Sequence, residues 1–211
     1  MKNKYSNILK IIFPNKNINY FVLCIVIIGV TFGAIFARII GVNDQNLVIE
    51  KIKLFIDNVN NNTLNNMLVF KNSISINFIY TFLIWILGMT LLGIIFVICL
   101  LFLKSFIFGF SVASFIVTYK YKGIIISSIY LLFGQLLNIV TVIILSIYSI
   151  TFTIKLLKLI FKNNTNNIEI KKFMKNYSII LIISIFINIL SSLCETFILP
   201  SLIKLIIKLY I

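Results

Sequence analysis

Residues 72–103 read NSISINFIYTFLIWILGMTLLGIIFVICLLFL, and after Lys104 a further apolar stretch, SFIFGFSVASFIVT, continues to residue 118. A water-soluble domain of this length cannot bury so long a continuous apolar segment. A helix that crosses a bilayer, by contrast, needs only about 20 mostly apolar residues. The stretch therefore predicts two membrane-spanning helices, and the whole chain is expected to be an all-α polytopic membrane protein.

The turn between these two helices could lie at either of two places. A turn at Lys104 would leave only 14 residues for the second helix. That helix would be about 21 Å long at 1.5 Å per residue, too short for a hydrocarbon core of about 30 Å. A turn from Gly88 to Gly93 gives spans of about 74–90 and 93–118. We favour this second division, which places Lys104 inside the membrane.

The composition supports the membrane assignment. The chain has 211 residues, of which 61% are hydrophobic, and its mean hydropathy is +1.11. Ordinary soluble domains are about 45–50% apolar. The net charge of +14 comes from 19 Lys and Arg against five Asp and Glu. Because the cations stand at the ends of apolar segments, we expect them to contact membrane lipids, and we expect no nucleic-acid partner.

Three further spans are predicted, at about 21–41, 124–154 and 178–199, the last ending before Pro200. Residues 119–123 form a short interfacial turn between the third and fourth spans. Residues 43–73 are amphipathic, and three asparagines at 60–62 interrupt their helical periodicity. Two short helices on the membrane surface fit this pattern, with Thr63 as the N-cap of the second.

Lysine placement predicts the orientation. The N-terminal segment and the loop 155–177 are rich in lysine, whereas 43–73 is balanced in charge. Positively charged segments face the cytoplasm. Four spans separate the two basic segments, so both can be cytoplasmic. The prediction is a single membrane domain of five helices with the N-terminus in the cytoplasm and the C-terminus outside it.

The catalytic groups of most enzymes are missing from the sequence. It has no histidine, which excludes serine-protease triads and HExxH metal sites. Of the five acidic residues only Glu195 falls in a predicted span, so an intramembrane pair of carboxylates cannot form. Nucleotide-binding glycine motifs are also missing. We therefore expect a protein that is not an enzyme, with no catalytic residues, no cofactor and no metal.

Three ionisable residues fall inside predicted spans: Arg38, Lys104 and Glu195. A charge at the centre of a spanning helix costs at least about 2.5–3.5 kcal/mol, so such residues suggest function. Arg38 and Glu195 should reach a similar depth and could form an ion pair, although each could instead reach the headgroups. Lys104 could bind Gln135, Asn138 or backbone carbonyls.

Small residues are expected where helices approach closely. Gly29 and Gly33 form a GxxxG pattern in the first span, which is typical of close helix contacts in membranes. The other glycines that we expect at packing positions punctuate the second and third spans. The complete set is Gly29, Gly33, Gly88, Gly93 and Gly109.

Several short motifs occur together in an order that resembles a known family. They are FGAI at 32–35, WILG at 85–88 with Gly93, LFLK at 101–104, GF at 109–110, Gln135, and Glu195 ahead of LPS at 199–201. In order and spacing the sequence resembles the stage II sporulation protein M family of spore-forming bacteria, over nearly the whole chain. It departs from the family pattern in lacking a proline near Gln135.

The resemblance implies a non-enzymatic membrane scaffold of endospore formation. Members of the family act during engulfment, at the sporulation septum and the engulfing mother-cell membrane. The resemblance implies that the protein recruits two peptidoglycan-remodelling partners, the stage II sporulation proteins D and P. The alternative is a small transporter or permease subunit, with a polar interior formed by Lys104, Gln135, Asn138 and Glu195.

Overall fold

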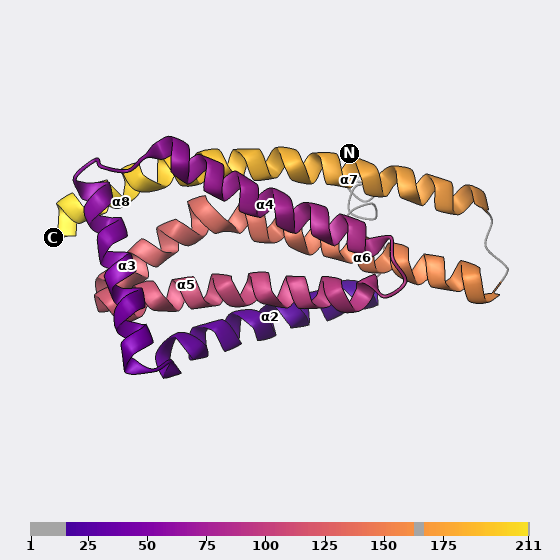
Figure 1. The fold of residues 1–211 in the computed structure, drawn as a ribbon, viewed down its shortest axis with the longest axis horizontal. Coiled ribbons are helices and arrows are strands. Elements are labelled where there is room, and N and C mark those ends of the chain that lie inside the picture. Colours follow the sequence, from indigo (N-terminus) through magenta and orange to yellow (C-terminus); the bar gives the residue numbers. More distant parts are fainter. Residues whose placement is uncertain (1–15, 163–166, 211) are drawn as a thin grey trace, which may run out of the picture.

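The computed structural model describes residues 16–162 and 167–210, which are almost entirely helical and contain no strand (Figure 1). Five helices in these ranges are long and apolar enough to cross a membrane. The chain is therefore a multi-pass membrane protein. In order, its elements are α2 (Lys16–Ile39), α3 (Val42–Asn60), α4 (Asn66–Gly88), α5 (Gly93–Ile129), the π-helix η1 (Tyr130–Gln135), α6 (Leu136–Lys162), α7 (Asn167–Leu193), the π-helix η2 (Cys194–Ile198) and α8 (Leu199–Tyr210).

The turn between the second and third spans lies between Gly88 and Gly93, as the length argument predicts. Side chains from other helices cover the free carbonyls at the end of α4. Thr153 Oγ1 donates to the Gly88 carbonyl at 2.7 Å, and Tyr177 Oη donates to the Trp85 carbonyl at 3.0 Å. The last carbonyls of a helix have no partner within it, so these bonds stabilise the turn inside an apolar environment.

A second reversal lies at Lys120, where φ is 52° and ψ is −123°. These angles are not helical, and they divide α5 into a long span and a short segment that leads into η1. This bend lies within the predicted turn at 119–123, and its position at the membrane interface stays a prediction. Figure 1 shows the chain doubling back here, at the end of the bundle crossed by α3.

Residues 43–73 differ from the two surface helices predicted for them. Only α3 is separate, and the second stripe of apolar residues is the beginning of α4, which continues into the second span. The predicted N-cap was wrong by two residues. Asn65 caps α4, with its Oδ1 accepting from the Leu68 N–H at 3.1 Å, whereas Thr63 donates to the Asn58 side chain at 2.9 Å.

The last two spans also have other boundaries than predicted. Helix α6 continues to Lys162 and α7 begins at Asn167, so most of the predicted basic loop 155–177 is helical, with 163–166 outside the described residues. The helix does not end at Pro200, because α8 follows η2 directly. In η2 the Leu199 N–H donates to the Cys194 carbonyl five residues back. This wider turn accommodates the proline ring that would strain a regular α-helix.

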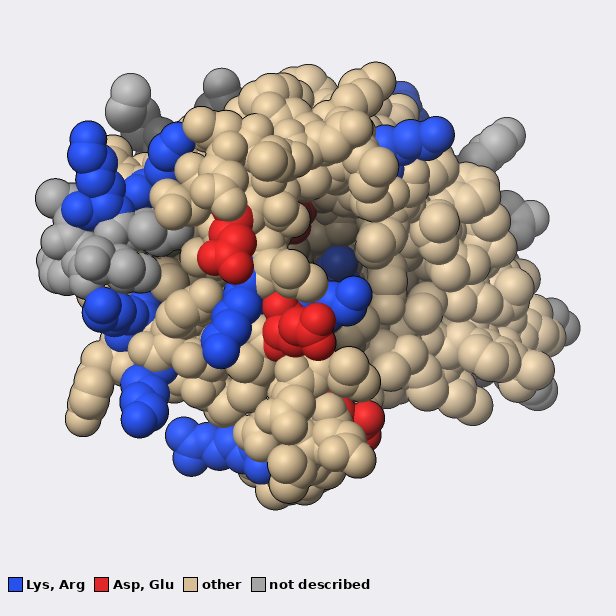
Figure 2. Space-filling model, turned by 60° about the vertical axis from the view of Figure 1, so that its left-hand side comes forward, with Lys and Arg blue, Asp and Glu red and all other residues tan. Residues whose placement is uncertain are grey.

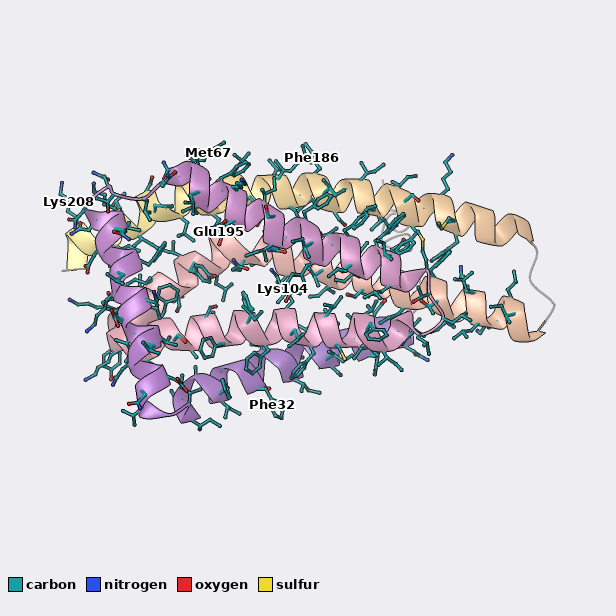
Figure 3. All side chains as sticks on the ribbon, in the orientation of Figure 1. Phe32, Met67, Lys104, Phe186, Glu195 and Lys208 are labelled. Carbon is teal, nitrogen blue, oxygen red and sulfur yellow. The ribbon has the colours of Figure 1, made fainter. Side chains whose placement is uncertain are left out.

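Helix α6 is the centre of the bundle. In its most apolar window 67% of the residues are buried, against 17–33% in the other spans. It packs against α4, α5 and α7, whereas α2 lies outside and packs mainly along α5. Phe32 on α2 and Phe186 on α7 are 58% and 63% exposed and point away from the bundle (Figure 3). This exposed apolar surface is suited to contact with lipid tails.

Glycines bring α2 and α5 close together. A Cβ on Gly29 would lie 2.7 Å from the Ser105 Cβ, and one on Gly33 or Gly109 would overlap the backbone of the opposite helix. A Cβ on Gly88 would likewise overlap the side chains of Ser149 and Tyr177 from neighbouring helices. Gly93 is different, because a Cβ there would meet the Leu87 carbonyl of its own turn. Four of the five predicted glycines thus lie between helices and one lies in a turn.

Candidate functional site

One face of α4 carries Ser73, Asn77 and Thr81, which are spaced four residues apart and therefore lie above one another along the helix. This face turns into the bundle, where Asn77 and Thr81 are 3% and 1% exposed. Buried polar groups cost free energy unless they are hydrogen-bonded. The partners of these three side chains come from α5, α6, α7 and the π-helix η2.

Lys104 enters this interior from α5 and is buried. Its Nζ donates to Asn77 Oδ1 at 3.2 Å and lies 4.9 Å from the centre of the Tyr80 ring. Asn138 Nδ2, from α6, donates to the same Asn77 oxygen. Asn188 Nδ2, from α7, donates to Thr81 Oγ1 at 2.6 Å. We call Asn77, Thr81, Lys104, Asn138 and Asn188 the central polar cluster, which joins four helices.

A second group surrounds Glu195. Ser73 Oγ donates to Glu195 Oε2 at 2.6 Å, and Gln135 Nε2 donates to Oε1 at 3.1 Å. Ser192 Oγ lies 3.1 Å from Ser73 Oγ. We call Ser73, Gln135, Ser192 and Glu195 the Glu195 cluster. Asn77 joins it to the central polar cluster, because its Nδ2 lies 3.5 Å from Ser73 Oγ.

Both π-helices meet at the Glu195 cluster. Gln135 is the last residue of η1 and Glu195 is the second of η2. Ser191 Oγ donates to the Gly134 carbonyl at 3.0 Å, which holds the two segments side by side. A π-turn re-aims side chains relative to a regular helix and often occurs at functional sites. Here two such turns direct an amide and a carboxylate toward each other.

The two clusters lie among α4, α5, α6 and the end of α7 with η2. Figure 3 shows Lys104 and Glu195 there, with Glu195 nearer the end that carries α3 and α8. Seen from that end, the surface is hollowed, and charged side chains lie within the hollow (Figure 2).

The structure brings together four of the five polar residues singled out from the sequence: Lys104, Gln135, Asn138 and Glu195. Arg38 is not among them, and of the two possibilities for Arg38 the ion pair with Glu195 does not form. Helix α2 packs on α5, away from η2, and Arg38 is exposed beside Ile116 and Tyr121. Similar depth in the membrane did not bring the two charges together, because their helices are not neighbours.

Sequence reasoning missed Ser73, Asn77, Thr81 and Asn188. Their spacing on α4 was a usable signal, since Ser73, Asn77 and Thr81 repeat every four residues. The signal is weak because Ser73 falls in the predicted surface segment 43–73 and asparagine carries no charge. Asn188 has no comparable periodic partner in the sequence, and only the packing of α7 on α4 brings it to Thr81.

The arrangement offers amides, hydroxyls, one ammonium and one carboxylate. In the described ranges there is no group of three or more His, Cys, Asp or Glu side chains that could hold a metal ion. What the clusters can do is connect helices. Hydrogen bonds between membrane helices contribute roughly 0.6–2 kcal/mol each, and those described here link every span except α2.

Comparison with known proteins gives one result. The family model of stage II sporulation protein M matches residues 8–200, most of the chain. No curated protein and no solved structure matches significantly. The match spans all five apolar helices and both polar clusters. The chain therefore belongs to the stage II sporulation protein M family, and its role is in sporulation.

Proposed function

We propose that the protein is a non-enzymatic membrane scaffold that recruits the peptidoglycan-remodelling stage II sporulation proteins D and P to the septum during engulfment. The observation that carries this proposal is the position of α3. This helix does not span the membrane but lies across one end of the bundle, beside α8 (Figure 1). It forms a platform attached to the membrane domain.

Helix α3 has two different faces. Ile56 and Val59 are buried and pack with Phe115 and Ile203 of the helices beneath. The exposed part of α3 carries Asp44, Glu50 and Asp57, three of the five acidic residues in the chain. Exposed Lys51, Lys53, Leu47 and Leu54 lie among them. In a protein of charge +14 these carboxylates make α3 chemically distinct.

Figure 2 shows acidic side chains among basic ones around the hollow at this end of the molecule. When both signs of charge occur on an interface, complementary charges on the partner fix how the two proteins align and exclude wrong partners. The buried face fixes α3 in place, so a partner meets an ordered surface. A fixed surface lowers the entropy cost of binding compared with a flexible loop. This supports recruitment by α3.

The test replaces exposed acidic residues of α3 by lysine and leaves the buried residues of this helix unchanged. The variant Asp44→Lys/Glu50→Lys should insert into the membrane in normal amounts, since both side chains are exposed. We expect it to lose partner recruitment. The measurements are co-purification of proteins D and P with the tagged chain and the septal position of fluorescent partner proteins in sporulating cells.

A charge reversal at the opposite end of the bundle serves as the control. Lys175→Glu alters an exposed residue of α7 and should leave recruitment unchanged. Undiminished co-purification of both partners with the α3 variant would rule out α3 as the recruiting surface. Point changes are preferable to deleting residues 44–75, because α4 begins at Asn66 and a deletion would shorten a span.

One observation favours a second candidate function, passage of a small solute or proton. The two polar clusters form a continuous line of hydrogen-bonding groups from Glu195 to Asn188. Such lines occur in transporters and proton relays. Liposomes that contain the protein should then show a flux of protons or a small solute, and Lys104→Met should abolish it. If the liposomes are impermeable, transport is excluded and the scaffold function is the one that stands.

A further inference from the structure

Arg38 and Lys120 lie together, although they are far apart in sequence. Both line an open depression of about 360 Å³, together with Ile116, Val117 and Tyr121. No acidic residue lines this depression. Arg38 is in the last turn of α2 and Lys120 is at the bend of α5, so both stand where a span ends. Two cations and an 87% exposed tyrosine at such a level are typical of headgroup contact.

The backbone at Lys120 is unusual. Its φ of 52° with ψ of −123° belongs to the region that favours glycine, and a side chain there is strained. Strain at a non-glycine residue often marks a functional position. Lysine at this position needs a reason beyond the turn itself, since glycine would form the turn more easily.

An apolar groove lies beside this depression. Its volume is about 350 Å³, and it runs between α2 and α5. The groove and the depression share the lining residues Arg38 and Ile116, so they adjoin each other. The small side chain of Ala34 helps to leave the groove open. The other residues that line it are mostly apolar: Val30, Ile35, Phe108, Gly109, Val112, Ala113 and Leu131.

We propose that the groove and the depression together bind one anionic phospholipid. Its headgroup phosphate lies between Arg38 and Lys120, and one acyl chain follows the groove between α2 and α5. The arginine can form two parallel hydrogen bonds to phosphate oxygens, and the lysine adds a compact charge. The adjoining apolar groove selects a lipid over a free phosphate. This site also gives a role to Lys120, a cation on the predicted outer side of the membrane.

The test uses the full-length protein in detergent and native mass spectrometry, with phosphatidylglycerol and phosphatidylcholine as probes. The wild type should retain one phosphatidylglycerol in preference to phosphatidylcholine. Arg38→Gln and Lys120→Gly should each lower the affinity for phosphatidylglycerol about fivefold, the scale of one cation near an anionic headgroup. Lys120→Gly also relaxes the strained turn, so misfolding cannot explain its loss of lipid.

Lys122→Gln is the matched control, since Lys122 is exposed in the same turn but does not line the depression. It should bind like the wild type. Ala34→Phe fills the groove and should weaken lipid binding while both cations remain. Glycerol 3-phosphate should not displace the lipid. Equal retention of the two lipids by the wild type, unchanged binding by Arg38→Gln and Lys120→Gly, or displacement by glycerol 3-phosphate would overturn the proposal.

Discussion

Lys104 shows how a single charged residue is accommodated inside the bundle. Its ammonium group is buried, donates to Asn77 Oδ1 and lies over the Tyr80 ring. Asn77 also accepts from Asn138, so one side-chain oxygen serves donors from α5 and α6. The oxygen dipole of this amide faces the charge in a medium of low dielectric constant, and the Glu195 carboxylate of the same interior also attracts it.

At this scale we predict that Asn77→Ala destabilises the protein through Lys104. Removing the acceptor leaves a buried ammonium unpaired, and the free energy of unfolding should fall by about 2–3 kcal/mol. In a Lys104→Met background the same substitution should cost clearly less. The measurement is reversible unfolding in mixed micelles, analysed as a double-mutant cycle.

Asn72→Ala is the control, because Asn72 lies on the exposed side of the same helix. Its effect should stay within about 0.5 kcal/mol. If Asn77→Ala costs the same with and without Lys104, the two residues act independently and Asn77 contributes through its other bonds.

At the scale of elements, the contact between α2 and α5 depends on the close approach of two backbones. Gly29, Gly33 and Gly109 lie in it, and the Phe36 ring makes tilted contacts with Phe106 and Phe110 at its edge. Attraction between membrane helices comes from packing rather than from the hydrophobic effect, so backbone distance decides the strength of the contact. Helix α2 depends on it more than the other spans do.

We predict that Gly33→Ala weakens this contact. A Cβ at Gly33 would overlap the Phe106 carbonyl, a backbone group that cannot move aside alone. The cost should be about 1–3 kcal/mol, as for overpacking in a core. Thermal unfolding of the purified protein in detergent measures it.

Gly41→Ala is the matched control for this substitution. A Cβ there meets no atom within 4 Å, and the φ of −54° suits alanine. The stability should change by no more than about 0.5 kcal/mol. An equally stable Gly33→Ala protein would show that α2 can move away from α5 at little cost.

At the scale of the whole molecule, connections alternate between the two ends of the bundle. Figure 1 shows the turn between α4 and α5 and the far ends of α6 and α7 at one end, with α3 and α8 at the other. The first described residue of α2 and the last of α8 are therefore at opposite ends. This arrangement fits five crossings, and which end faces the cytoplasm stays a prediction from the lysine distribution.

Cysteine labelling in intact cells tests that orientation. In a variant without Cys24, Cys99 and Cys194, we expect Lys53→Cys on α3 to react with a membrane-impermeant maleimide from outside. Lys158→Cys on α6 should react only after the membrane is opened. Both positions are exposed, so whether the maleimide reaches each cysteine depends only on the side of the membrane where it lies. Labelling of both residues from the same side would contradict five crossings.

The sequence alone determined the membrane class, the five apolar helices and two of the turns, at Gly88 to Gly93 and at Lys120. These features can be predicted from the sequence because hydropathy and helix length depend only on the residues of one continuous segment. The start of α4 was misplaced because an amphipathic beginning and a surface helix have the same periodicity. Pro200 predicts the end of a helix, and the π-turn that carries the chain past it has no sequence signature.

Only the tertiary structure decided which side chains meet. Asn77 and Asn188 look like ordinary polar residues in apolar helices until α4, α5, α6 and α7 are packed together. Arg38 and Glu195 have complementary charges at a similar predicted depth, yet α2 packs on α5 and the pair does not form. Depth in the membrane is fixed by each helix alone, whereas a contact depends on how helices are rotated and which are neighbours, and that is a property of the whole bundle.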